Sequence, residues 1–202
     1  MASRELDYYE GAWSRSDVSF QDEPLVLVDE HDQETGFLDK ASAHSGHGIL
    51  HRAFSLFVFN AAGELLLQQR AGGKRLWPGY WSNTCCSHPR RGESMEKAIH
   101  RRLGEELGMQ CQFQFRFKFQ YQAQFDAEGA ENELCWVYTG RSDAAPVANR
   151  NEIAALRYIS PDGLDHEIAA HPEQFTPWFK IEWDSLRREH AHLFQSSAAL
   201  PS

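Results

Sequence analysis

The sequence has few cysteines and no long apolar run. Only four of its 202 residues are cysteine, and two of them, Cys85 and Cys86, are adjacent. This content is too low for a disulfide scaffold, so we expect a reducing, cytoplasmic location. The first thirty residues lack the basic start and the apolar segment of a secretion signal, and no later segment has about 18 consecutive apolar residues. We therefore expect neither export nor a membrane span.

Basic residues are also scarce. Lysine and arginine number 20 against 29 aspartate and glutamate residues, which gives a net charge of −9. Proteins that bind nucleic acids or anionic membrane surfaces neutralise many phosphates and carry the opposite sign of charge. We therefore expect no nucleic acid and no membrane as partner. A small anionic substrate is compatible with this charge if basic residues or a metal ion make the potential positive locally.

The length and the 42% hydrophobic content suit one compact domain. Residues 1–22 are polar and predict a loosely attached N-terminal extension, and residues 197–202 predict a C-terminal tail. We expect residues 23–196 to form a single domain that acts as a monomer or weak dimer.

Alternation of apolar and polar residues predicts antiparallel strands. Residues 53–59 and 64–70 predict a hairpin around the turn at residues 60–63. From Cys111 to Phe125, every second residue is aromatic or apolar, which predicts a long strand with one buried face. Residues 133–139 predict the returning strand.

Two helices are expected among these strands. Ser94 can cap a helix that Gly108 ends, and a second helix is predicted at about residues 178–194. The apolar stripe of the first helix consists of Met95, Ala98, Ile99, Leu103 and Leu107. Mixed strands with interspersed helices predict an α/β or α+β sandwich.

Five side chains have the chemistry of metal ligands: His44, His51, His88, Glu131 and Glu133. The two glutamates are two residues apart on an expected strand, so both leave the same face about 7 Å apart. Two carboxylates that face one point repel each other unless a cation lies between them. Each residue alone is also compatible with a solvated surface, and no local zinc signature is present, so the ligands must converge through the tertiary structure.

The helix at residues 92–109, GESMEKAIHRRLGEELGM, resembles the Nudix helix, whose motif has Gly, five residues, Glu, seven residues and then REUxEExGU. Arg102 and Glu106 lie at i and i+4 on one face and could hold a phosphate and its Mg²⁺. Ala98 and Arg102 stand where a Nudix hydrolase has glutamates that bind metal. These two departures disfavour a hydrolase.

Longer segments resemble the type I isopentenyl diphosphate isomerases, a branch of the Nudix superfamily. The segments are LDKASAH, LHRAFS, QQRAGGKRLWPGYWSNTCCSHP, RRGES, FQYQAQFDAEGAENELCWVY and TPW, in matching order between about Val26 and Phe194. The resemblance implies a Nudix-type fold with mixed β-sheets sandwiched by helices and makes residues 23–196 a catalytic domain. It implies an isomerase of isoprenoid biosynthesis that interconverts isopentenyl and dimethylallyl diphosphate by protonation and deprotonation, a 1,3-allylic shift.

The resemblance also implies roles for the residues of the site. Cys86 and Glu133 match the acid/base pair, Tyr121 matches a hydrogen-bonding tyrosine, and Trp178 matches the aromatic ring that faces a carbocation. In an extended segment the side chain of Cys85 points away from that of Cys86, so we expect Cys85 to pack in the core.

The remaining implied roles concern metals and the diphosphate substrate. His44, His51, His88, Glu131 and Glu133 match the ligands of one Mn²⁺, Mg²⁺ or Zn²⁺. Lys40, Arg70, Lys74, Arg102 and Ser87 match substrate-binding positions. Glu106 matches a ligand of a second Mg²⁺ that bridges the phosphates.

Two other interpretations stay open at this point. A Nudix pyrophosphohydrolase would split a diphosphate link, and a non-enzymatic metal-binding or protein-binding module would use the cysteines and histidines structurally.

Overall fold

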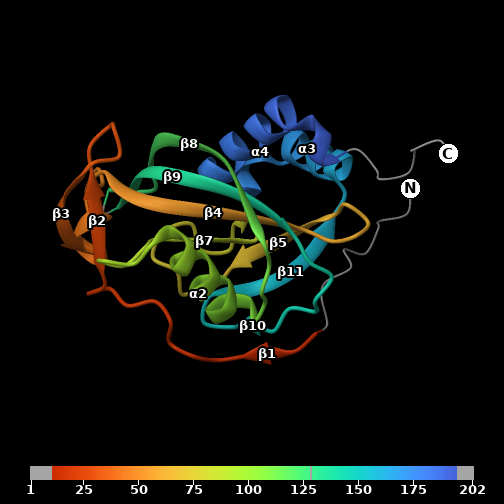
Figure 1. The fold of residues 1–202 in the computed structure, drawn as a ribbon, viewed down its shortest axis with the longest axis horizontal. Coiled ribbons are helices and arrows are strands. Elements are labelled where there is room, and N and C mark those ends of the chain that lie inside the picture. The colour runs from red at the N-terminus through yellow and green to blue at the C-terminus, as the bar shows by residue number, and fades with distance from the viewer. Residues whose placement is uncertain (1–10, 128, 195–202) are drawn as a thin grey trace.

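The computed structural model of the protein describes residues 11–127 and 129–194 (Figure 1). Its longer strands are β2 (Pro24–Val28), β3 (Glu34–Asp39), β4 (His51–Phe59), β5 (Leu65–Arg70), β8 (Phe113–Gln124), β9 (Ala130–Arg141) and β11 (Ile153–Ile159). The short strands are β1 (Trp13–Ser14), β6 (Trp81–Ser82), β7 (Cys85–Ser87) and β10 (Ala148–Asn149). The helices are α1 (Lys40–Ala43), α2 (Met95–Leu107), α3 (Pro161–Ala170) and α4 (Pro177–Glu189), with 3₁₀ turns at Pro172–Gln174 and Ala191–Phe194. The expected tail at residues 197–202 lies outside the described residues.

Strand β4 organises the larger of the two sheets. It pairs in parallel with β9 along its whole length, from His51 opposite Glu133 to Phe59 opposite Arg141, and antiparallel with β7. Strand β8 continues this sheet beside β9 and places Tyr121 opposite Glu133. The hairpin of β8 and β9 and the distant strand β4 therefore bring Tyr121, Glu133 and His51 side by side.

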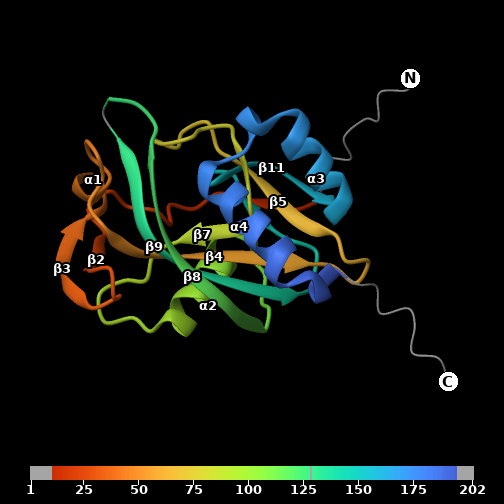
Figure 2. The ribbon, with the colours of Figure 1, turned by 90° about the horizontal axis from the view of Figure 1, so that it is seen from above.

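Helices cover both faces of this sheet. Figures 1 and 2 show α3 and α4 on one face and α2 on the other. One buried cluster packs under α4 and includes Phe57, Phe179 and Leu186, and a second packs under α2 and includes Phe54 and Leu103. The predicted α+β sandwich is confirmed. None of the described helices has the length and apolar character needed to cross a membrane.

The expected helices form, with one difference in length. The Ser94 side chain accepts a hydrogen bond from the Lys97 amide, and Gly108 ends α2 in the left-handed conformation at φ 61°. The second expected helix starts as predicted but ends at Glu189. His190, with φ −127°, breaks it, and the chain continues as a 3₁₀ turn.

The aromatic row of β8 does not form one buried face. Phe115 pairs with Tyr138 and Phe117 pairs with Val137, so Arg116 is an extra residue that forms a β-bulge. Because side chains alternate between the faces of a strand, one extra residue moves the row to the other face. Phe117 packs with the cluster under α4, whereas Phe115 lies against Tyr138 and is 49% exposed.

Two further expectations differ from the structure. The strands β4 and β5 pair only where Phe59 lies opposite Leu65. Beyond that point they separate, and β7 pairs with β4 while β6 pairs with β5. The described part of the N-terminal extension, residues 11–22, is attached to the domain. Strand β1 pairs with β10, and Asn149 Nδ2 donates to Ser16 O over 2.8 Å. Sequence patterning does not detect this attachment because its partners lie more than a hundred residues away.

A carboxylic acid is buried between α4 and the sheet. Glu182 is fully buried, its Oε1 lies 3.5 Å from Cys135 Sγ, and its Oε2 has no hydrogen-bond partner among the described residues. Burial disfavours the ionised form and raises the pKa of Glu182 to about 8, although hydrogen bonds with Ser55 and Cys135 act in the opposite direction. Glu182 is therefore largely neutral at pH 7.

We expect Glu182→Gln to stabilise the protein increasingly as the pH rises. A glutamate in the unfolded chain ionises near its ordinary pKa of 4.5, while the folded Glu182 keeps its proton up to about pH 8. The stability that the wild type gains from this group is full below pH 4.5 and is lost as the pH rises towards 8, with a slope of up to about 1.4 kcal/mol per pH unit. Urea unfolding at several pH values in this window measures the difference. A difference that does not change with pH would contradict a neutral Glu182.

Candidate active site and metal centre

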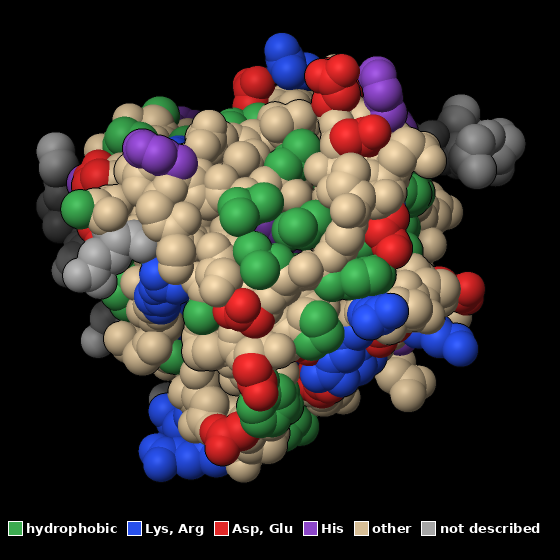
Figure 3. Space-filling view, turned by 90° about the vertical axis from the view of Figure 1, so that its left-hand side faces the viewer, with side chains coloured by type: hydrophobic (Ala, Val, Ile, Leu, Met, Phe, Trp, Pro, Cys, Tyr) green, Lys and Arg blue, Asp and Glu red, His purple; other side chains and the backbone are tan. Residues whose placement is uncertain are grey.

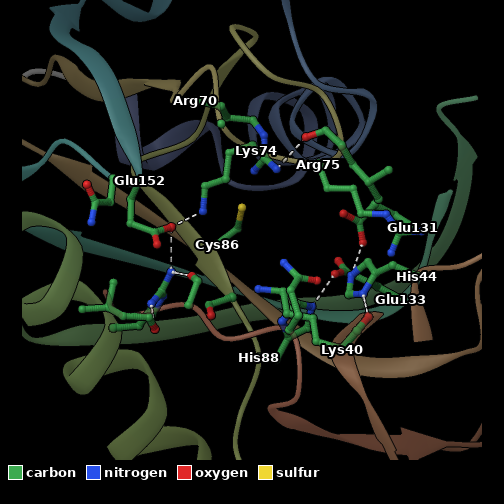
Figure 4. Close-up of a pocket in the computed structure, with 18 of the residues that line it drawn as sticks. Lys40, His44, Arg70, Lys74, Arg75, Cys86, His88, Glu131, Glu133 and Glu152 are labelled. Atoms are coloured by element: carbon green, nitrogen blue, oxygen red, sulfur yellow. Dashed lines mark hydrogen bonds and ion pairs between the residues drawn. The ribbon is translucent and has the colours of Figure 1, made fainter. Parts of the chain in front are cut away.

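A pocket of about 230 Å³ collects side chains from both halves of the sequence (Figure 4). Lys40, His44, Arg70, Lys74, Cys86, Ser87, His88, Arg102, Tyr121, Glu131, Glu133 and Trp178 line it. Two of the residues expected at the site, His51 and Glu106, are absent from this lining. Every other residue expected at the site contributes to one cavity.

The five expected metal ligands converge at one end of this pocket. All are buried, and their ligand atoms lie within 4.8 Å of one another. His44 ends α1, His51 begins β4, His88 follows β7, and both glutamates lie on β9. His88 Nε2 lies 2.9 Å from Glu133 Oε1 and 3.2 Å from His51 Nε2, and His44 Nε2 lies 2.9 Å from Glu131 Oε2.

The orientation of these side chains fits a divalent metal ion. The Nδ1 atoms of His44 and His51 lie 2.8 and 2.7 Å from the carbonyl oxygens of Lys40 and Ile49. A ring that donates from Nδ1 to a carbonyl directs the lone pair of Nε2 towards the centre, as metal-bound histidines do. Glu131 Oε2 is buried and faces the Nε2 atom of His44. Three imidazoles and two carboxylates are ligands that suit Mn²⁺, Zn²⁺ or Mg²⁺.

The electrostatics of the cluster favour the same conclusion. Burial and the neighbouring His51 and Lys40 keep the pKa of His88 well below its ordinary value, so the ring is neutral and able to bind a metal. Burial alone would raise the pKa of Glu133, but hydrogen bonding and charge from His51, together with the Tyr121 hydroxyl, lower it. An anion of this kind, buried beside a second carboxylate, requires positive charge nearby.

Cys86, Tyr121 and Glu133 lie next to the metal centre. Tyr121 donates a hydrogen bond from its hydroxyl to Glu133 Oε2 over 2.6 Å. Cys86 is half-buried and faces the same pocket (Figure 4), where burial is the main reason that its pKa rises to about 12. The thiol is therefore protonated at neutral pH. Cys85 is fully buried in the cluster under α2, on the opposite face from Cys86, as the alternation of a strand predicts.

An aromatic wall closes the apolar side of the pocket. Trp178 stands in the first turn of α4, its ring meets the edge of Trp77 at 5.3 Å between centroids, and it is 6.1 Å from the ring of Tyr121. The guanidinium carbon of Arg70 lies 5.4 Å from the Trp178 ring, a cation–π contact. The face of Trp178 thus already accepts positive charge in the free protein.

The other end of the pocket concentrates positive charge. Arg102 projects from α2 and donates to Val18 O, Ser19 Oγ and Glu106, at 2.7, 2.7 and 2.8 Å. Burial, together with the charges of Lys74 and Arg102, lowers the pKa of Lys40 to about 8. This concentration contrasts with the face drawn in Figure 3, where basic and acidic side chains are interspersed. A polyanion would therefore be attracted to this pocket although the protein is acidic overall.

Residues that sequence reasoning did not identify complete this end. Glu152, Asn151 and the segment Asp17–Ser19 all line the pocket. Their partner Arg102 is 50 residues from Glu152 and 84 from Val18, so no local pattern could have identified them. His47, which lies between His44 and His51 in the sequence, is exposed and lies outside the metal cluster, with its Nδ1 3.0 Å from Gln124 Oε1.

Comparison with known proteins identifies the general class of the chain. The NUDIX domain model matches residues 49–179. A crystal structure from Deinococcus radiodurans is 26% identical, with a TM-score of 0.60, and covers 73% of this chain and 90% of its own. The NUDIX domain of Shewanella oneidensis NrtR, at 16% identity and a TM-score of 0.53, shares the fold and covers 70% of this chain and 87% of its own. The fold and the family model define a Nudix protein.

Closer relatives carry a more specific name. A Pectobacterium atrosepticum protein named isopentenyl-diphosphate Delta-isomerase is 45% identical over 174 residues, which are 83% of this chain and 97% of that protein. Isopentenyl-diphosphate Delta-isomerase 1 of Photorhabdus laumondii is 43% identical with the same two coverages. The chain belongs to the isopentenyl-diphosphate Delta-isomerase family, which confirms the resemblance of its motifs.

We expect the wild type to bind one divalent ion with high affinity and His88→Ala to weaken that binding by at least about 100-fold. His88 would supply one of the three nitrogen ligands, from a ring whose Nε2 lies 2.9 Å from Glu133 Oε1. Equilibrium dialysis against Mn²⁺ or Zn²⁺ with metal analysis measures the affinity. His47→Ala is the control and should bind like the wild type, because His47 lies outside the cluster. Equal loss in both variants would contradict the assigned ligands.

Proposed function

We propose that this chain interconverts isopentenyl diphosphate and dimethylallyl diphosphate, with Cys86 and Glu133 as the proton-transferring pair. The observation that carries the proposal is that one pocket holds a neutral thiol, a buried carboxylate, an aromatic wall and a cluster of cations. The names of the relatives supply the substrate class, and the following steps relate it to these residues.

The chemical step sets two requirements. An isolated alkene is a weak base, so a proton must be delivered by a well-placed acid, and the carbocation that forms must be kept from water. One proton is added to the terminal alkene carbon and one is removed from C2, so the total number of protons on the enzyme is the same before and after a turnover. Two proton-transferring groups and a dry pocket are therefore needed.

Cys86 and Glu133 meet the first requirement. The thiol is neutral and the carboxylate is ionised in the free protein, so one member of the pair carries a proton and the other can accept one. Tyr121, hydrogen-bonded to Glu133 at 2.6 Å, orients the carboxylate and can relay its proton. Trp178 meets the second requirement, because a ring face over a desolvated cation contributes about 2 kcal/mol.

The metal ligands and the cations complete the proposed site. A divalent ion held by His44, His51, His88, Glu131 and Glu133 would supply positive charge beside the Glu133 carboxylate and tune its pKa. Lys40, Arg70, Lys74, Arg102 and the Ser87 segment would bind the diphosphate.

Glu106 is assigned to a second Mg²⁺ by resemblance. Its Oε1 accepts from Arg102 at 2.8 Å, and it does not line the pocket. We keep Glu106 as a proposed Mg²⁺ ligand on the condition that Arg102 or Glu106 moves when the diphosphate binds.

The surroundings of the site complete the proposal. The four cysteines are free thiols, which supports a reducing, cytoplasmic location. We also propose that residues 23–196 form the catalytic domain and that the protein works as a monomer or weak dimer, without a nucleic acid or membrane partner.

Product analysis tests the proposed reaction. Incubation with isopentenyl diphosphate and Mg²⁺ should yield dimethylallyl diphosphate without release of inorganic phosphate. Ala98, where a Nudix hydrolase has a glutamate, is fully buried and offers no ligand atom. Stoichiometric phosphate release would instead identify a pyrophosphohydrolase, and the absence of any turnover with metal present would favour a binding module.

We expect Cys86→Ala to lower kcat by at least about 100-fold, because a positioned acid or base contributes about 10²–10⁴ in rate. The adjacent Cys85→Ala is the matched control. Its side chain lies in the core under α2, so this variant should lose about 1–2 kcal/mol of stability and keep kcat within about threefold. Steady-state kinetics and thermal unfolding of both variants measure the two effects. Full activity of Cys86→Ala would exclude this thiol as a proton carrier.

A further inference from the structure

We propose that Glu152 is a positioning residue that occupies the place of a substrate phosphate in the free protein, holding Lys74 and Arg102 as a preset pair and making the site selective for diphosphates over monophosphates. The proposal rests on the proposed function for the identity of the substrate. Glu152 has no part in the Nudix motif or in the acid/base pair, and its place in the pocket is its first indication of a role.

The carboxylate of Glu152 is bound to two cations at once. Its Oε2 accepts from Arg102 at 3.0 Å and is in an ion pair with Lys74 Nζ. Glu152 is 3% exposed, yet it lines the pocket that the diphosphate would enter. Figure 4 shows Glu152 reaching towards Lys74 beside Cys86. Lys74 and Arg102 are two of the residues assigned to the substrate, so Glu152 binds the same groups that the phosphates would bind.

The backbone of Glu152 also holds the loop that carries Lys74. Glu152 O accepts from the amide of Ala71 at 2.9 Å, and the amide of Lys74 donates to Ala71 O at 3.1 Å. Gly72 and Gly73 lie between these anchors and leave the loop conformationally free without them. One residue therefore anchors both the backbone of the loop and the ammonium group at its end.

Charge explains why this arrangement is needed. Burial is the main reason that the pKa of Lys40 falls to about 8, and the nearby charges of Lys74 and Arg102 lower it further. Burial would raise the pKa of Glu152, but Lys74 and Arg102 outweigh it and lower that pKa to about 2. Glu152 is therefore an anion over the whole physiological pH range. Without it, three neighbouring cations would repel one another and Lys74 would turn towards solvent.

Selectivity follows from exchange of one anion for another. A ligand that enters must replace the contacts of Glu152 with Lys74 and Arg102. A diphosphate carries more negative charge and more acceptor oxygens than a monophosphate, so it can compensate for the contacts it displaces and still bind Lys40 and Arg70. A monophosphate carries less charge and fewer oxygens, so it compensates for fewer of these contacts. The buried carboxylate thus penalises the smaller anion, which is specificity through a repulsive element.

The test measures binding of inorganic pyrophosphate and inorganic phosphate to the metal-loaded protein by isothermal titration calorimetry. The wild type should bind pyrophosphate at least about 100-fold more tightly than phosphate. Glu152→Gln should reduce this ratio at least tenfold, because phosphate no longer competes with a carboxylate and pyrophosphate loses the preset geometry. Glu152→Asp keeps the negative charge. We expect its affinity ratio to lie closer to the wild type, with at least half of the loss in Glu152→Gln recovered on a logarithmic scale.

Glu105→Gln is the matched control. Glu105 is also ion-paired with Arg102, at 3.3 Å, but it does not line the pocket. Its ratio should stay within about twofold of the wild type. The proposal is overturned if Glu152→Gln is folded by thermal unfolding and its ratio of pyrophosphate to phosphate affinity equals that of the wild type. It is also overturned if this ratio falls equally in Glu105→Gln. Because the readout is binding of inorganic anions, loss of the proposed isomerase activity would leave the result for Glu152 unaffected.

Discussion

The structure of the site depends on two buried carboxylates at the start of β9, which require positive charge around them. Glu131 and Glu133 leave the same face of that strand, both are buried, and the pKa of each is lowered by neighbouring histidines despite burial. Two buried carboxylates are tolerated only where positive charge and hydrogen bonds surround them. The parallel pairing of β4 with β9 brings His51 opposite Glu133, and His44 and His88 are held in place around the same point. The pairing of β4 with β9 thus helps to determine the geometry of the metal centre.

The same principle applies at the opposite end of the pocket with the charges reversed. Arg102 is 3% exposed and is surrounded by Glu106, Glu152 and the oxygens of Val18 and Ser19. In a hydrolase motif a glutamate would stand at this position of the helix. A guanidinium in place of that carboxylate adds an anion-binding group to a helix face that still carries Glu106, which agrees with the proposed diphosphate site.

Two uncharged side chains, those of Cys86 and Trp178, line the same pocket. Cys86 carries its proton in the free protein, and Trp178 presents a ring with which the Arg70 guanidinium makes a cation–π contact. A polarisable ring face tolerates a short-lived cation. The pocket therefore combines charged groups, where the diphosphate and the metal would bind, with a thiol and an aromatic ring beside the ionised Glu133.

The amino-acid sequence by itself determined the α+β class, the caps of α2 at Ser94 and Gly108, and the opposite directions of Cys85 and Cys86, because capping and strand alternation are local properties. Its motifs also identified the family. The sequence did not reveal the bulge at Arg116. The alternation of aromatic and polar residues continues without a break past this position, although the bulge turns the following side chains to the other face of the sheet. It also missed the attachment of residues 11–22 and the contacts of Glu152 in the pocket. Only the tertiary structure decided these features, because the partners of Glu152, Lys74 and Arg102, are 78 and 50 residues away and meet it only when the pocket is assembled.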